Sequence, residues 1–128
     1  MKILVADDSL ITRKILQRAL ENANFNVIIA EDGDDAWQKL TESPDISLAI
    51  LDWMMPGLSG IDICKKLSKK PSGFVYVILL TAKDGHKNLD DAIRAGASDF
   101  IHKPFDNEEL LARIRAGQRT INRKREQL

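Results

Sequence analysis

The chain has 128 residues, of which 44% are hydrophobic and 30% are charged, as is typical of one compact globular domain. No apolar run approaches the roughly 18 residues of a membrane-spanning helix, and residues 1–10 lack the pattern of a signal peptide. The single cysteine, Cys64, excludes an intramolecular disulfide, and two isolated histidines argue against a zinc site. We therefore expect a cytoplasmic protein without a membrane partner.

The net charge is zero, but it is unevenly distributed along the chain. Residues 113–128 carry six cationic side chains and one acidic side chain, a net charge of +5, so the remaining residues sum to −5. No aromatic residue accompanies these cations to stack on bases, whereas cations suit the end of a helix. A solvated helix end is the simplest interpretation of this tail, and we expect no direct contact with nucleic acid.

Short segments rich in Val, Ile and Leu alternate with helical patterns five times. Most are continuous apolar runs, which are typical of strands buried on both faces of a parallel sheet. This alternation predicts an α/β fold, a doubly wound (βα)5 sandwich in a single domain. The predicted strands are 2–6, 26–30, 46–52, 74–80 and 99–102.

The segments between the strands predict amphipathic helices with recognisable starts. Ser59 with Asp62, and Asp106 with Glu109, have the spacing of residues that cap the beginning of a helix. A second helix is predicted over 33–42. On the first helix one apolar stripe is predicted, formed by Ile11, Ile15, Leu16, Ala19, Leu20 and Ala23.

Polar residues stand at the carboxyl ends of four predicted strands. Asp7 and Asp8 follow the first strand, Asp52 ends the third, Thr81 follows the fourth and Lys103 follows the fifth. Ligands bind at these ends in open α/β sheets. Each residue alone has an ordinary explanation as a turn, a helix cap, a loop residue, a strand-end hydroxyl or a solvated lysine. Their combination indicates a site.

Four motifs occur in order at these ends: "DD" after the first strand, "D-x-x-M-P-G" from Asp52, "TA" at Thr81 and "KPF" at Lys103. Together they resemble the response-regulator receiver family over about residues 1–120. The resemblance implies a flavodoxin-like parallel sheet of five strands in the order 2-1-3-4-5. It also implies a two-component phosphorelay, with a histidine kinase or phosphotransfer protein as donor and an output domain or effector protein as target.

In that strand order the first and third strands are neighbours, so Asp7, Asp8 and Asp52 converge. Two carboxylates about 4 Å apart repel by roughly 4 kcal/mol at an effective dielectric near 20. Either one keeps a proton or a cation occupies the cluster. An all-oxygen site suits Mg²⁺. The resemblance implies Mg²⁺ ligands at Asp8, Asp52 and the backbone carbonyl of Met54, with Asp7 acting through water.

The resemblance makes Asp52 the phosphoacceptor, with Lys103 and Thr81 as its catalytic partners. The Thr81 hydroxyl, the Ala82 amide and the Lys103 ammonium would bind the phosphoryl oxygens. Thr81 and Phe100 would form a switch that remodels the face of the fourth helix, fifth strand and fifth helix, where a homodimer could form. Phe100 is explained equally well as a half-buried strand aromatic.

Two positions implied by the resemblance concern the lifetime of the phosphoryl group. Met54 and Lys83, two residues after Asp52 and Thr81, would border the path of the hydrolytic water. Neither side chain can act as a base, so we expect a long-lived aspartyl phosphate. His102 is expected to lie on the surface without a chemical role.

The main alternative is a small Mg²⁺-dependent phosphohydrolase with an aspartyl nucleophile. Such enzymes usually place the nucleophile after the first strand in a D-x-D pattern, with a general acid two residues on. Here Asp52 follows the third strand and Met54 stands two residues on. We therefore expect a regulatory phosphoacceptor that catalyses only its own phosphorylation and slow dephosphorylation, and not an enzyme.

Apolar residues continue a seven-residue spacing into the basic tail. Ile114, Ile121 and Leu128 occupy d positions of a heptad, although two of the three a positions are polar. Gly117 weakens this helix by about 1 kcal/mol. We predict that residues 117–128 extend the last helix as a weak seam between protomers and lead to an output domain of nucleotide-cyclase type. The alternative is a frayed, solvated end.

Overall fold

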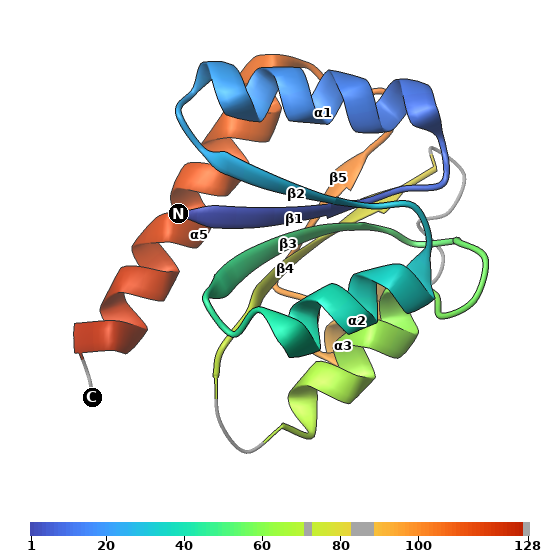
Figure 1. Cartoon of the computed structure of the whole chain (residues 1–128). Helices are drawn as coiled ribbons and strands as arrows, with labels where there is room; N and C mark the ends of the chain where they lie inside the picture. The colour runs from blue at the N-terminus through green and yellow to red at the C-terminus, as the bar shows by residue number, and fades with distance from the viewer. Residues whose placement is uncertain (71–72, 83–88, 127–128) are drawn as a thin grey trace.

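The computed structural model describes residues 1–70, 73–82 and 89–126, in which strands and helices alternate along the chain (Figure 1). The strands β1 to β5 are Lys2–Ala6, Asn26–Ala30, Ile46–Asp52, Tyr76–Thr81 and Asp99–His102. The helices α1 to α5 are Leu10–Asn22, Gly33–Glu42, Gly60–Ser68, Leu89–Ala95 and Asn107–Glu126.

The five strands form one parallel sheet in the order β2-β1-β3-β4-β5, which confirms the predicted fold and strand order. Every residue of β3 is buried, in agreement with its continuous apolar sequence. The order places β1 beside β3 and β4 beside β5, with all strands parallel. The carboxyl ends of these four strands therefore lie at one edge of the sheet, where the polar residues of the predicted site occur.

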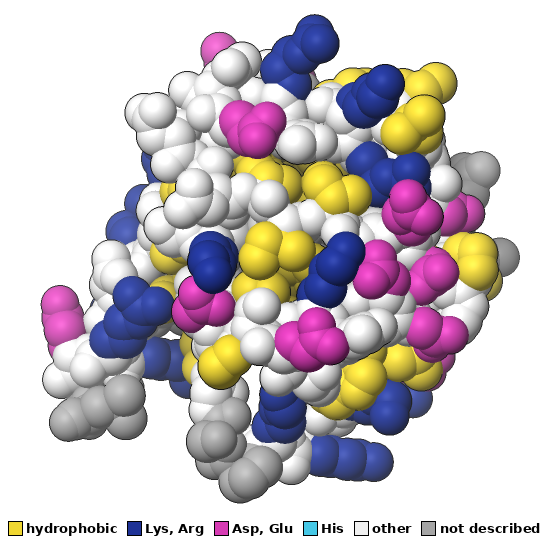
Figure 2. Space-filling view, viewed as in Figure 1, with side chains coloured by type: hydrophobic (Ala, Val, Ile, Leu, Met, Phe, Trp, Pro, Cys, Tyr) yellow, Lys and Arg dark blue, Asp and Glu magenta, His cyan; other side chains and the backbone are white. Residues whose placement is uncertain are grey.

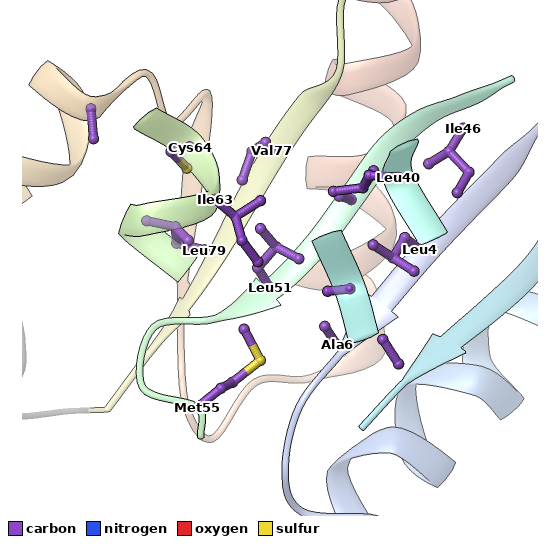
Figure 3. Close-up of a cluster of buried hydrophobic side chains, with 14 of the residues drawn as sticks. Leu4, Ala6, Leu40, Ile46, Leu51, Met55, Ile63, Cys64, Val77 and Leu79 are labelled. Carbon is purple, nitrogen blue, oxygen red and sulfur yellow. The ribbon is translucent and has the colours of Figure 1, made fainter. Parts of the chain in front are cut away.

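Helices cover both faces of the sheet, and each face has its own buried cluster. On one face Ala36 of α2, Ile63 of α3 and Ala92 of α4 pack against the strands, and Figure 3 shows strand side chains converging on α2 and α3. On the other face Leu16 of α1 and Leu110 of α5 pack against the strands. Within the described ranges, no helix combines the length and apolar character needed to cross a membrane.

The helices begin where the sequence predicts. The Ser59 side chain accepts a hydrogen bond from the Asp62 backbone N–H, and the Asp62 carboxylate accepts one from the Ser59 N–H, each at 3.1 Å. Asp106 accepts a hydrogen bond from the Glu109 N–H at 2.7 Å at the start of α5. The helix predicted over 33–42 is α2. These local polar contacts define the first turns of α3 and α5.

The prediction of a strand over 74–80 is wrong at both ends, because β4 runs from Tyr76 to Thr81. The ladder with β3 begins with Leu48 opposite Tyr76. Gly73 has a φ of +83°, and Phe74 is 40% exposed, so the apolar run enters the sheet two residues later than its composition suggests.

The apolar stripe predicted on the first helix is also wrong in part. Leu16, Ala19 and Leu20 are buried against the sheet, but Ile11 and Ile15 are 72% and 50% exposed. An α-helix turns by about 100° per residue, so Ile15 lies at the margin of the buried face and Ile11 lies beyond it. These side chains form an exposed apolar surface.

Helix α5 continues through the basic tail to Glu126 and packs on the body of the protein. Ile114 and Ile121 are 0% and 3% exposed in the cluster beneath α1 and α5. They are therefore not free to form the predicted seam between protomers. The Lys124 ammonium lies 4.5 Å from the centroid of the Phe74 ring, which holds the last turns of α5 to the segment that precedes β4. Leu128 lies outside the described residues.

Gly117 allows α5 to approach the sheet closely. A Cβ atom at this position would lie 2.8 Å from Cδ1 of Tyr76 and 2.9 Å from Cδ1 of Leu48. Both distances are well below ordinary carbon contacts. The residue that weakens the isolated helix is therefore required for its packing.

We predict that Gly117→Ala lowers the free energy of unfolding by about 1 kcal/mol. Overpacking costs about 1–3 kcal/mol, which exceeds the gain of about 1 kcal/mol in helix propensity. Urea denaturation measures the change, with Asn122→Ala at an exposed position of α5 as the control. The control should be neutral or stabilising. A Gly117→Ala protein as stable as wild type would contradict the packing argument.

Candidate functional site

Three carboxylates meet at the carboxyl edge of the sheet. Asp7 and Asp8 follow β1, and Asp52 is the last residue of the neighbouring strand β3. Each offers one oxygen atom, and the three oxygens lie within 4.8 Å of one another. Asp8 is exposed, whereas Asp7 and Asp52 are 0% and 9% exposed. Figure 2 shows acidic side chains gathered at this edge, to the right of the view. The oxygens of the three clustered carboxylates are ligands of the kind that Mg²⁺ binds.

Lys103 joins two of these carboxylates. Its Nζ lies 2.9 Å from Oδ2 of Asp7 and 3.4 Å from Oδ1 of Asp52. The other oxygen of Asp7 accepts a hydrogen bond from the Ser9 N–H at 2.8 Å. Both oxygens of Asp7 are thus engaged within the protein. When all three carboxylates are ionised, these three and Lys103 together carry a charge of −2, which a divalent cation would balance.

Burial raises the pKa of Asp52 to about 6, and the charges of Asp7 and Asp8 act in the same direction. The Lys103 ammonium opposes this rise without cancelling it. Burial lowers the pKa of Lys103, but its hydrogen bond to Asp7 and the charge of Asp52 outweigh burial and leave that pKa raised. The lysine is therefore charged at neutral pH, and the costly state is ionised Asp52.

The loop that carries Met54 is held by the turn that precedes and begins α2. The Gly33 N–H donates to the Pro56 carbonyl at 3.1 Å, and the Asp34 carboxylate accepts from the Leu58 N–H at 3.3 Å. A Cβ on Gly33 would lie 1.6 Å from the Leu58 carbonyl oxygen. These contacts were not predicted, because Gly33 and Asp34 stand in the sequence only as the first residues of the helix expected over 33–42.

Thr81 ends β4 beside the site and is 1% exposed. Its Oγ1 lies 2.7 Å from Nδ1 of His102 on β5. His102 is exposed, as expected, but this contact was not predicted. Ala82 is exposed next to Thr81, and Phe100 is half-buried against the cluster beneath α2, α3 and α4. Lys83 lies outside the described residues.

We predict that Asp52→Asn raises the free energy of unfolding at pH 7 in metal-free buffer by on the order of 2 kcal/mol. The pKa of Asp52 is about 6 in the folded protein, against an ordinary value of 3.8. Wild-type Asp52 therefore contributes stability that is present below pH 4 and is lost as the pH rises through about 6. The amide carries no charge at any pH, so the advantage of the variant should shrink toward pH 4.

Urea titrations at pH 4, 5, 6 and 7 measure this difference. Asp45→Asn is the matched control, because Asp45 lies just before β3 at the opposite edge of the sheet and pairs with Lys2. It should give no gain in stability. An Asp52→Asn protein without a gain at pH 7, or with the same gain at pH 4, would contradict the electrostatic account.

Comparison with known proteins gives one family. A family model described as the response regulator receiver domain matches residues 3–115. The chain is 39% identical over 115 residues to the transcriptional regulatory protein ResD of Bacillus subtilis, covering 90% of this chain and 47% of ResD. It is 35% identical over 117 residues to the chemotaxis protein CheY1 of Helicobacter pylori, covering 89% and 94% of the two chains. The chain spans about half the length of the transcriptional regulators that it matches.

Solved structures agree with these matches. The receiver domain of the Francisella response regulator 1452 has a TM-score of 0.82 at 32% identity, covering 93% of this chain and 98% of that chain. A probable two-component system response regulator/GGDEF domain protein has a TM-score of 0.88 at 27% identity, covering 95% of this chain and 50% of that chain. The strand order of this chain places its acidic residues at the edge where ligands bind in such sheets. The chain therefore belongs to the response regulator receiver domain family.

Proposed function

We propose that Asp52 accepts a phosphoryl group and that its phosphorylation switches the conformation of this receiver domain to regulate an output. The observation that carries the proposal is the placement of Asp52 within one cluster with Asp7, Asp8 and the Lys103 ammonium. Asp52 stands at the end of a buried strand, so its position is fixed, and it is not covered completely. Membership of the receiver family supports the same role.

The proposal includes Mg²⁺ bound by Asp8, Asp52 and the backbone carbonyl of Met54, with Asp7 acting through water. The exposure of Asp8 supports a direct contact, since its carboxylate faces solvent. Asp7 already accepts hydrogen bonds from Ser9 and Lys103, which supports an indirect role. Bound Mg²⁺ would supply positive charge opposite the carboxylates and the phosphoryl oxygens.

In the proposed transfer, an Asp52 carboxylate oxygen attacks phosphorus and forms the new O–P bond. The P–N bond of a donor phosphohistidine breaks, and the departing nitrogen keeps the electron pair. Lys103, 3.4 Å from Oδ1 of Asp52, offsets the negative charge. The Thr81 hydroxyl and the Ala82 N–H would hold phosphoryl oxygens, and the small Ala82 side chain leaves room for them. Thr81 and Phe100 would then act as the switch.

A phosphohydrolase is not favoured by these findings. The candidate nucleophile follows β3, and the chain matches the receiver family over most of its length. Met54, two residues after Asp52, has no proton to donate to a leaving group. We propose that the chain catalyses only its own phosphorylation and a slow dephosphorylation, because Met54 does not orient water.

The proposed donor is a histidine kinase or phosphotransfer protein, and the exposed apolar surface of α1 supports a docking partner there. Leu10, Ile11 and Ile15 are 55%, 72% and 50% exposed. A surface pocket lined in part by Ile15, Ala82 and Lys103 connects this surface to the site. Figure 2 shows hydrophobic side chains over α1, above the acidic edge. Patches of this kind commonly mark protein interfaces.

The proposed output lies beyond α5. Residues 1–120 would form the receiver domain, and 117–128 would extend α5 as a linker toward an output domain or effector. The structural similarity to a response regulator/GGDEF domain protein supports an output of nucleotide-cyclase type. We propose a homodimer through the α4–β5–α5 face and a cytoplasmic location for the protein.

We predict that acetyl phosphate with Mg²⁺ adds one phosphoryl group to the wild-type chain and none to Asp52→Asn. Asp52 lies within the carboxylate cluster and its Oδ1 is 3.4 Å from the Nζ of Lys103, whereas Asp7, which Lys103 also reaches, is fully buried. Intact-mass spectrometry measures the product, and the linkage should be labile to acid and base. Chelation of Mg²⁺ should abolish the reaction.

Asp45→Asn is the control for this experiment and should be labelled like wild type, since Asp45 lies at the far edge of the sheet. Labelling of Asp52→Asn at an acid-stable residue would overturn the assignment. Absence of labelling in the wild-type chain would overturn the proposed function.

We predict that Asp8→Asn weakens Mg²⁺ binding at least tenfold, because it removes an exposed charged ligand from the cluster. Trp53 follows Asp52 and can report binding by fluorescence, in a Trp37→Phe background that leaves it as the only tryptophan. Asp45→Asn in that background should bind Mg²⁺ like the unaltered reporter. Equal affinities for the Asp8 and Asp45 variants would refute the ligand assignment.

A further inference from the structure

A side-chain hydrogen bond joins the ends of β4 and β5 beside the site. Oγ1 of Thr81 lies 2.7 Å from Nδ1 of His102, and the two residues are direct partners in the strand pairing. Thr81 is 1% exposed. Within the described residues, every buried side-chain nitrogen or oxygen has a hydrogen-bond partner. For the Thr81 hydroxyl that partner is His102.

The backbone holds this contact in place. The Lys103 N–H donates to the Thr81 carbonyl at 2.8 Å, immediately after the paired residues. Alternate residues of a strand point to the same side, so His102 and Phe100 lie on one side of β5. Phe100 packs against the cluster beneath α2, α3 and α4. His102 is therefore paired with Thr81 across the strands and lies on the side of the sheet that Phe100 occupies.

We propose that His102 is a positioning residue that holds the Thr81 hydroxyl in the resting conformation. The inference rests on the proposed function, in which the same hydroxyl binds a phosphoryl oxygen. The Thr81 O–H has one proton, which it donates to Nδ1 of His102 in the tautomer protonated at Nε2. It cannot donate that proton to a phosphoryl oxygen at the same time. Phosphorylation of Asp52 thus competes with His102 for Thr81.

This competition sets the equilibrium between the resting conformation and the phosphorylated conformation. Replacement of His102 by an apolar residue leaves a buried hydroxyl without its partner, which raises the free energy of the resting state alone. The phosphorylated state, in which the hydroxyl has a phosphoryl partner, is not affected. A ligand that selects that state then binds more tightly. One neutral hydrogen bond corresponds to a change of about twofold to tenfold in this equilibrium.

The experiment compares His102→Val, which cannot accept the hydrogen bond, with His102→Asn, whose amide can replace it. Beryllofluoride with Mg²⁺ serves as the probe, because it mimics a phosphoryl group on a carboxylate. Titrations on the full chain should give about twofold to tenfold tighter binding for His102→Val and near wild-type binding for His102→Asn. NMR of the unliganded wild type should show the Nε2–H tautomer, and the Phe100 ring signals should shift toward the bound position only in the Val variant.

A double-mutant cycle with Thr81→Val isolates the pair. In that background His102→Val should leave the affinity for beryllofluoride unchanged. Equal affinities of wild type and His102→Val, or an Asn variant that behaves like Val, would overturn the role of His102 while leaving the proposed function intact. Failure of the wild type to bind beryllofluoride would instead overturn the proposed function and this inference with it.

Discussion

The cost of ionising Asp52 beside Asp7 and Asp8 is the constraint on which the rest of the site depends. Burial and like charges raise the pKa of Asp52 to about 6. Lys103 offsets only part of this cost, because its ammonium is closer to Asp7, at 2.9 Å, than to Asp52, at 3.4 Å. The remaining negative charge favours a divalent cation, and a cation beside a carboxylate favours phosphoryl transfer. The arrangement that costs stability is thus the one that the proposed chemistry needs.

Three features of the fold hold these side chains in place: the strand order, the turn that begins α2 and the packing of the helices. The strand order brings the ends of β1 and β3 together, and β5 supplies Lys103 from the far side of β4. The turn at Gly33 and Asp34 holds the loop after Asp52 through two hydrogen bonds, one from the Gly33 N–H to a carbonyl of the loop and one from an N–H of the loop to the Asp34 carboxylate. Helix packing keeps the sheet rigid from both sides, with α5 drawn close at Gly117. Groups held by packed elements need little rearrangement before they react.

The differences between expectation and structure have a common origin. Ile11 and Ile15 belong to an apolar stripe by composition, yet the sheet covers only the face of α1 that carries Leu16, Ala19 and Leu20. Ile114 and Ile121 have the spacing of a heptad, yet the protein's own sheet covers them. In both cases the spacing of apolar residues along the sequence predicts which side chains share a helix face. Which part of the protein covers that face depends on the tertiary packing.

The sequence by itself determined the alternation of strands and helices, the helix caps, the family and the residues at the strand ends. These features depend on local propensity and on motifs within a few residues, which are readable along the chain. Only the tertiary structure decided that Thr81 contacts His102, that Asp34 holds Leu58 and that Lys103 lies closer to Asp7 than to Asp52. These pairs lie 21, 24 and 96 residues apart. The distances between these residues follow from the register of neighbouring strands and the path of the loops. A difference of about one ångström decides whether a hydrogen bond forms, and packing, not residue type, sets that difference.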